Sequence, residues 1–128
     1  MSEESKAWLR KAERNLKAAE NSLSGGFPDE CVDRAYFAIF SAATAMGRVQ
    51  GKKFPACSGW MAEFKKSVTE PNGLDAKFQH YIEEAYQLRE KAVYDAFAEM
   101  SESEAKSTLD QATDFVAMAE EFLKQKGD

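Results

Sequence analysis

The sequence has little of what membrane-spanning proteins and β-sheet proteins need. Its longest stretch without a charged residue, from Ala35 to Gly47, is too short and too rich in small residues to span a bilayer. No segment alternates between apolar and polar residues for long enough to form a strand. The sequence therefore argues against a β-sheet fold, and we expect no membrane partner.

The shortage of histidine and cysteine argues against metal chemistry. The single histidine, His80, has Lys77 three residues before it, so the paired Glu-x-x-His motifs of a di-iron bundle are missing. Cys31 and Cys57 form no CxxC pair, and with one histidine they are poor zinc ligands. No glycine-rich loop carries the lysine and hydroxyl of a phosphate-binding loop. We therefore expect no metal and no other cofactor.

Length and charge fit one globular domain over residues 1–128. A net charge of −5 argues against a surface wholly devoted to nucleic acid, although one local basic site remains compatible with it. The acidic start Met1-Ser2-Glu3-Glu4 has no apolar run behind it. We therefore expect no signal peptide, a cytoplasmic location and two reduced cysteines, with Cys31 in the core and Cys57 at a helix entry.

Apolar residues recur at three- and four-residue spacing, which predicts an all-α bundle of four long helices and one short helix. The second long helix has the broadest apolar face and is expected to be central. Ser101 and Glu104 form a capping box that predicts the start of the last helix. The expected helices span about residues 5–24, 29–49, 58–66, 75–99 and 101–124.

Few residues suit catalysis. His80 is the only side chain with a reference pKa near neutrality, and a partly exposed polar role explains it more simply than general-base chemistry. The doublets Lys52-Lys53 and Lys65-Lys66 are explained more simply as solubilising surface residues than as phosphate ligands.

Arg89 differs from these residues because it lies between the apolar positions Leu88 and Ala92 of an expected helix. Two interpretations stay open. In one, Arg89 pairs with a carboxylate such as Asp33 or Asp95 and locks the second and third long helices together. In the other, its guanidinium belongs to a functional site.

Several segments resemble, in order and spacing, the HEPN domain and in particular its small stand-alone prokaryotic branch. They are Gly26-Phe27 with Cys31-Val32, the run Arg34-Ala35-Tyr36-Phe37-Ala38-Ile39-Phe40, Ser58-Gly59-Trp60-Met61, Leu88-Arg89 with Ala92-Val93-Tyr94-Asp95, and Ser103-Glu104-Ala105. The resemblance extends from about Lys11 to Phe122. It implies an up-and-down four-helix bundle with one additional short helix between helices two and three. It also implies a homodimer, often paired with a minimal nucleotidyltransferase in a two-component or toxin–antitoxin system.

Catalytic members of that family are metal-independent ribonucleases that use an arginine and, a few residues later, a histidine. The arginine stabilises the charged phosphoryl transition state and the histidine moves the proton. Arg89 matches the arginine, but Tyr94 or Asp95 occupies the histidine position, and no histidine follows His80. We therefore expect a non-catalytic member. Weak RNA cleavage by Arg89 with Tyr94 or His80 is one alternative, and a ligand-free helical adaptor is another.

The leading hypothesis is a HEPN homodimer that partners a nucleotidyltransferase and binds nucleotide or RNA phosphate near Arg89. Candidate nucleotide- or RNA-binding residues are Arg89, Tyr94, Asp95, Arg34 and Tyr36. The resemblance implies that the third long helix lies near the twofold axis, and small residues on the second and third long helices permit close helix approach there. These small residues are Ala38, Ala42, Ala43, Ala45, Ala85, Ala92 and Ala96.

Overall fold

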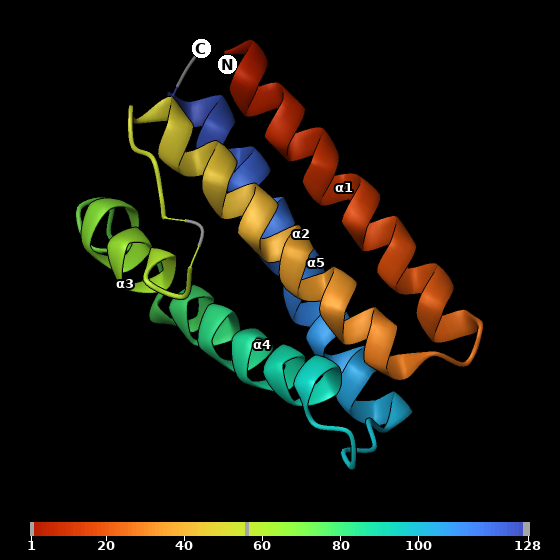
Figure 1. The fold of residues 1–128 in the computed structure, drawn as a ribbon. Coiled ribbons are helices and arrows are strands. Elements are labelled where there is room, and N and C mark those ends of the chain that lie inside the picture. The colour runs from red at the N-terminus through yellow and green to blue at the C-terminus, as the bar shows by residue number, and fades with distance from the viewer. Residues whose placement is uncertain (1, 56, 127–128) are drawn as a thin grey trace.

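The computed structural model describes residues 2–55 and 57–126, and every regular element in those ranges is helical (Figure 1). The predicted domain span of 1–128 therefore extends at both ends past the described residues. The elements are α1 (Glu3–Ser24), α2 (Pro28–Val49), the short α3 (Trp60–Phe64), the π-helical segment η1 (Lys65–Thr69), α4 (Ala76–Tyr94) and α5 (Glu102–Lys126). The prediction of a four-helix bundle with one additional short helix is confirmed.

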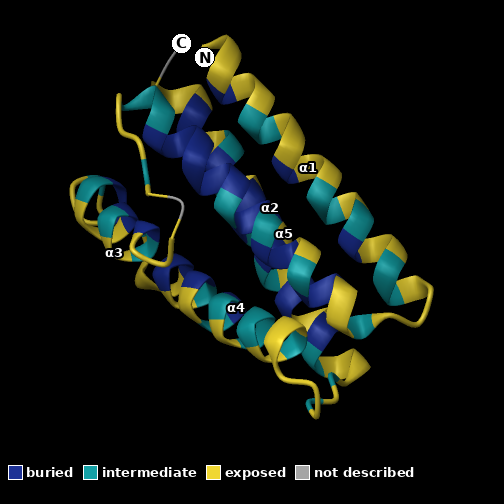
Figure 2. Cartoon of the chain, in the orientation of Figure 1, coloured by how far each residue is buried: buried dark blue, intermediate teal, exposed yellow. Residues whose placement is uncertain are grey.

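Helix α2 is the centre of the bundle, as its broad apolar face predicted. It contacts α1, α4 and α5, and Figure 2 shows it as the most continuously buried helix of the chain. Helices α1 and α4 lie on either side of it in the view of Figure 1. None of the helices in the described part of the chain is long and apolar enough to cross a membrane.

The helix starts follow their capping residues. The Ser2 hydroxyl accepts the amide of Ser5 at 3.1 Å, so α1 begins two residues earlier than its apolar stripe indicated. The capping box before α5 is confirmed: the Glu104 amide donates to the Ser101 hydroxyl at 3.0 Å, and the Ser101 amide donates to the Glu104 carboxylate at 3.1 Å. These hydrogen bonds with Ser101 lower the pKa of Glu104.

The expectation that the third long helix continues to residue 99 is wrong. Helix α4 ends at Tyr94, because Asp95 adopts an extended backbone and its carboxylate accepts the amide of Phe97 at 3.0 Å. An aspartate that bonds its own following backbone competes with helix continuation. Ala96, which was expected on the helical stripe, lies instead in an exposed turn.

The short helix begins at Trp60 and passes directly into the π-helical η1, which the sequence pattern did not predict. The Glu70 amide closes the wider turn by donating to the Lys65 carbonyl at 2.9 Å. Buried Gln79 of α4 holds this region by donating to the Met61 carbonyl and accepting the Thr69 hydroxyl. A five-residue π segment is too short for apolar spacing to distinguish it from an α-helix.

The small residues proposed for the dimer contact are used inside the single chain. Ala38, Ala42, Ala43, Ala45 and Ala85 all have no exposed surface in the monomer. They are covered by other helices of the same chain, so they cannot form a free interface. Ala92 is half-buried near the end of α4, and Ala96 lies in the turn that follows it.

Candidate functional site

Arg89 reaches from α4 to α2 and is held by two carboxylates. Its Nε donates to Oδ1 of Asp33 at 3.0 Å, and its Nη1 donates to Oε2 of Glu90 at 3.3 Å. The side chain is 19% exposed. Of the two carboxylates named from the sequence, Asp33 is therefore the partner of Arg89 and Asp95 is not. The ion pair joins the two helices as the first interpretation of Arg89 required.

Three aromatic rings surround the same guanidinium. The central carbon of the Arg89 guanidinium lies 5.5 Å from the ring centroid of Tyr36, 5.2 Å from that of Phe37 and 5.5 Å from that of Tyr94. Each distance is within the range of a cation–π contact. The rings come from both helices, so the arginine is fixed by packing as well as by charge.

Arg89 also lines an open groove of about 570 Å³, which we call the Arg89 groove. The groove lies between α2, α4 and the segment that enters α3. It is lined by Tyr36, Phe37, Phe40, Cys57, Ser58, Trp60, Tyr86, Arg89, Glu90 and Tyr94. Tyr94 is 70% exposed, so most of its ring area is available to a ligand or a partner.

The surroundings of the groove raise the pKa of its arginine and of its buried tyrosine, for different reasons. Burial alone would lower the pKa of Arg89, but the hydrogen bond and charge of Asp33, together with Tyr94 and Glu90, raise it. Burial raises the pKa of Tyr36, and the hydrogen bond that Trp60 donates to its hydroxyl at 2.9 Å offsets this only in part. At neutral pH a smaller fraction of Tyr36 is therefore present as the phenolate than for an exposed tyrosine.

His80 does not belong to this groove. It precedes Arg89 by two and a half turns of α4, which places it about 13 Å away along the axis and on the opposite face. Its Nε2 lies 2.8 Å from Oε1 of Glu84, and it lines a separate depression near η1. A single chain therefore does not present His80 and Arg89 to the same phosphate.

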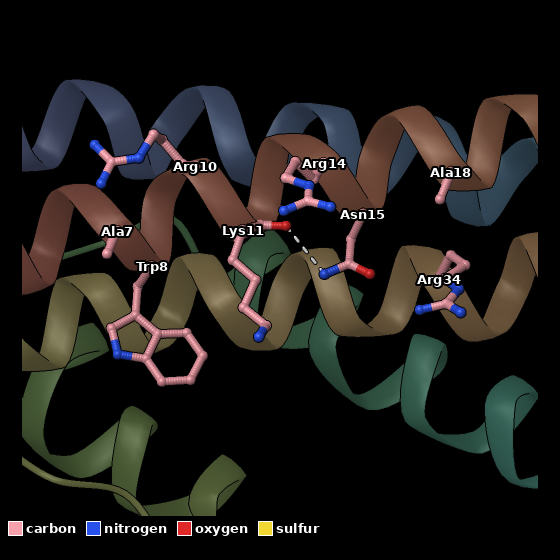
Figure 3. Close-up of a pocket in the computed structure, with 8 residues that line it drawn as sticks. All are labelled: Ala7, Trp8, Arg10, Lys11, Arg14, Asn15, Ala18 and Arg34. Carbon is pink, nitrogen blue, oxygen red and sulfur yellow. Dashed lines mark hydrogen bonds between the residues drawn. The ribbon is translucent and has the colours of Figure 1, made fainter.

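The structure brings together three of the five candidate residues: Arg89, Tyr94 and Tyr36 line one groove. The carboxylate of Asp95 instead accepts the Phe97 amide at the end of α4. Arg34 lies on α2 and lines another groove, between α1 and α2 (Figure 3). The helical register separates Arg34 from Tyr36, because the two residues lie about 200° apart around the axis of α2.

Several residues that line the Arg89 groove were not among the candidates named from the sequence, and Glu90 and Cys57 are two of them. Glu90 accepts both from Arg89 and from the Tyr86 hydroxyl, the latter at 3.2 Å. The four-residue spacing of Tyr86 and Glu90 on one helix could have indicated this contact. Cys57 lies directly before Ser58-Gly59, where the resemblance places a histidine in many family members, and it enters the groove because the loop after α2 returns to the bundle.

The second groove, with a volume of about 700 Å³, is strongly basic, and we call it the basic groove. It is lined by Ala7, Trp8, Arg10, Lys11, Arg14, Asn15 and Ala18 of α1 and by Arg34 of α2. Figure 3 shows Trp8, Lys11 and Asn15 extending from α1 over α2. The sequence analysis did not predict that these α1 cations line one groove together with Arg34.

Comparison with known proteins agrees with this fold. The family model described as HEPN domain matches residues 5–124. The chain is 32% identical over 118 residues to "Putative toxin MJ0142" of Methanocaldococcus jannaschii, covering 92% of this chain and 80% of that protein. It is 23% identical over 117 residues to a UPF0332 protein of Thermotoga maritima, covering 91% and 89% of the two chains.

A solved structure gives the same result at the level of the fold. The crystal structure of TT1696 from Thermus thermophilus superposes with a TM-score of 0.82 at 21% identity, covering 95% of this chain and all of that one. The long helices, their order and the match over nearly the whole sequence agree with the resemblance found in the sequence segments around Arg34 and Arg89. The chain belongs to the HEPN domain family.

Proposed function

We propose that this chain is a non-catalytic HEPN protein that acts as one component of a toxin–antitoxin-like pair. In this role it binds nucleotide or RNA in the Arg89 groove and partners a nucleotidyltransferase. Family membership and the relatives named as toxins support the system type. One observation carries the binding role: Arg89 lines a groove whose other walls are largely aromatic. No described residue of this groove is a histidine, which favours binding over cleavage.

The hydrogen bonds of Arg89 favour binding over a purely structural role. Asp33 takes the Nε atom and fixes the guanidinium plane, while the 3.3 Å contact to Glu90 is longer and belongs to a carboxylate that is 39% exposed. Among the described residues, Nη2 of Arg89 makes no hydrogen bond. A phosphate could therefore use Nη2 and displace Glu90 from Nη1, giving the bidentate geometry that guanidinium groups favour.

The rings supply the other half of a nucleotide site. Tyr94 presents an exposed ring beside Arg89, and Phe37 and Phe40 line the same groove. A nucleobase stacks on such a ring without sequence preference, because every base has an aromatic face. The ligand predicted for this groove combines a planar base with a phosphate.

The acid–base groups of the groove favour binding without cleavage. Apart from Arg89, its ionisable residues are Tyr36, Tyr86, Tyr94, Cys57 and Glu90. Glu90 is occupied by Arg89 and Tyr86, and Tyr36 has a raised pKa. Loss of a positioned general base typically lowers a rate by about 10²–10⁴-fold.

The homodimer is proposed at the end of α4, where large apolar side chains are exposed together. Phe97 is 95% exposed, and Val93 and Tyr94 are close to it in sequence. An isologous contact would pair this patch with itself and bring two Arg89 grooves near one axis. Glu90 and Asp33 would then offset the repulsion between the two arginines. The buried area is expected to be on the order of 1,200–2,000 Å² in total.

The test of ligand binding uses calorimetric titration with ATP, AMP and a short uridine oligonucleotide. The variant Tyr94→Ser removes an exposed ring of the groove. The matched control Phe27→Ser removes an exposed ring that does not line the groove. We expect the first variant, and not the second, to weaken binding. Titrations that show no heat with any of the three probes would reject the ligand part of the proposal.

The partner and the dimer are tested separately. Co-expression with the protein encoded beside this chain, followed by size-exclusion chromatography, should give one complex that contains a nucleotidyltransferase. Two separate peaks would reject the partnership. Light scattering should give a dimer mass for the wild type and a monomer mass for Phe97→Ser, and a monomeric wild type at tens of micromolar would reject the dimer.

A further inference from the structure

We propose that the basic groove between α1 and α2 binds the phosphodiester backbone of single-stranded nucleic acid. This second surface extends the proposed function but uses none of the side chains of the Arg89 groove. Four cations line it: Arg10, Lys11 and Arg14 of α1 and Arg34 of α2. Among the described residues no carboxylate lines it, although the chain as a whole carries a net charge of −5.

These cations have no acidic partner within the described ranges. Among residues 2–55 and 57–126, no ion pair closer than 4 Å involves any of the four. Asp33, which precedes Arg34 on α2, is occupied by Arg89 on another side of the helix. Four unpaired like charges repel one another, so an anionic ligand stabilises their arrangement.

Glu13, which lies between the cations of α1, faces α5 and not the basic groove. Glu13 shares its environment with Glu120 of α5, and burial followed by the Glu120 hydrogen bond and charge raises its pKa. The charge of Arg10 lowers that pKa, but it is the smallest of these influences. Glu13 is therefore directed at α5 and is not among the residues that line the basic groove.

The shape of the groove fits a strand more closely than a compact anion. Its α1 residues extend from Ala7 to Ala18, a distance of about 16 Å along the helix axis. Small residues at both ends leave room for the ligand to lie close to the helix. An elongated groove with several cations suits consecutive phosphates, and guanidinium groups bind phosphate oxygens in a bidentate manner.

Trp8 supplies an aromatic wall and links the basic groove to the Arg89 groove. The Lys11 ammonium lies 5.8 Å from the Trp8 ring centroid, which holds its charge beside the ring. The same ring meets Phe40 edge-on at 6.4 Å, and Phe40 lines the Arg89 groove. Cations beside aromatic rings are typical of surfaces that bind single-stranded nucleic acid.

The test measures fluorescence anisotropy of a labelled uridine oligonucleotide of about 12 nucleotides and of the matching deoxythymidine oligonucleotide. The variant Arg10→Gln/Arg14→Gln/Arg34→Gln removes three cations of the groove. The matched control Lys52→Gln/Lys53→Gln/Lys124→Gln removes the same charge from exposed positions elsewhere. Tyr94→Ser reports on the Arg89 groove, so failure of one surface is distinguishable from failure of the other.

We expect the groove variant to weaken binding at least about tenfold and to reduce the slope of log affinity against log salt by about 2, at roughly 0.7 per lost phosphate contact. The control should change both quantities much less. Binding of either oligonucleotide with this pattern supports the proposal, and the two probes decide between RNA and DNA. Undetectable binding at about 50 mM salt, or equal losses in variant and control, contradicts it.

One further outcome also contradicts the proposal. If neither oligonucleotide binds while the groove variant loses its complex with the nucleotidyltransferase, the groove recognises an acidic protein surface. Circular dichroism and thermal melting of each variant verify folding. Because all six substituted side chains are exposed, the melting temperatures should stay close to that of the wild type.

Discussion

The Nε atom of Arg89 in α4 donates to Oδ1 of Asp33 in α2 at 3.0 Å, across 56 residues of sequence. This single contact orients the arginine of the proposed ligand groove and fastens two helices together. Stability and binding are therefore coupled at one side chain. A variant of either residue changes both properties, and a double-mutant cycle isolates the part that the pair contributes to stability.

Replacement of Asp33 with Asn should lower the free energy of unfolding by about 1 kcal/mol, since the pair is partly exposed and solvent screens part of its charge. Urea unfolding of Asp33→Asn, Arg89→Gln and the double variant gives the coupling energy. We expect a positive coupling, because each single change leaves the other group without its charged partner. Strict additivity would show that the pair contributes nothing to stability.

RNA cleavage should not depend on Arg89. Wild type and Arg89→Ala incubated with mixed cellular RNA are expected to give the same band pattern over time, because His80 lies on the opposite face of α4 and the groove supplies no other strong base. Gel electrophoresis of the two samples, prepared in parallel, is the measurement. Cleavage by the wild type that the variant lacks would establish residual ribonuclease activity instead.

One of the two cysteines should react with thiol reagents in the folded protein. Cys57 is exposed at the rim of the Arg89 groove, whereas Cys31 is buried and burial raises its pKa to about 11. The thiolate is the reactive form, so Cys31 is protected by its environment and by its protonation. A thiol-reactive chromophore should titrate one group per chain in buffer and two in denaturant. A variant Cys57→Ser should titrate none in buffer.

Much of the fold could be predicted from the sequence because helices bury periodic stripes. The central position of α2 followed from its broad apolar face, and the start of α5 followed from Ser101 and Glu104. The early end of α4 could not be predicted, since the Asp95 side chain competes with a pattern that continues as far as Ala96. Periodicity counts apolar residues and does not detect this competition.

The candidate site was predictable in part, for a related reason. Pairing of Arg89 with Asp33 was one of two named possibilities, and the grouping with Tyr36 and Tyr94 was proposed from the family resemblance. Arg34 and Tyr36 lie about 200° apart around α2, so their separation was predictable from the helical register. Which face of α2 meets α1 and which meets α4 was not predictable. Packing partners are decided by tertiary contacts that one sequence does not contain.

The capping box should make a small, acid-sensitive contribution to stability. Backbone and side-chain hydrogen bonds with Ser101 lower the pKa of Glu104 below its ordinary value of 4.5. A lowered folded-state pKa means that the contribution is complete above the unfolded value and is lost as the pH falls through the folded one. Carbon-13 NMR titration of the side-chain carboxyl should show the lowered pKa. Ser101→Ala should raise that pKa only in part, because the backbone amide of residue 101 still donates to the carboxylate.

Gly47 of α2 is expected to resist substitution, because a Cβ atom there would lie 2.6 Å from Cε2 of Phe54. The Phe54 ring cannot retreat freely, since it packs against Trp60 and Phe64 at centroid distances of 6.5 and 5.9 Å. Overpacking of this kind costs about 1–3 kcal/mol, and the gain in helix propensity from Gly to Ala offsets up to about 1 kcal/mol of it. Gly47→Ala should therefore lower the free energy of unfolding by about 1 kcal/mol.

The control for this effect removes the ring that causes it. In a Phe54→Leu background the added methyl group meets a smaller and more flexible side chain, so Gly47→Ala should be neutral or stabilising there. Thermal and urea unfolding of the four proteins in the cycle measure the change of sign. If Gly47→Ala destabilises both backgrounds equally, the contact with Phe54 is not what requires glycine at this position.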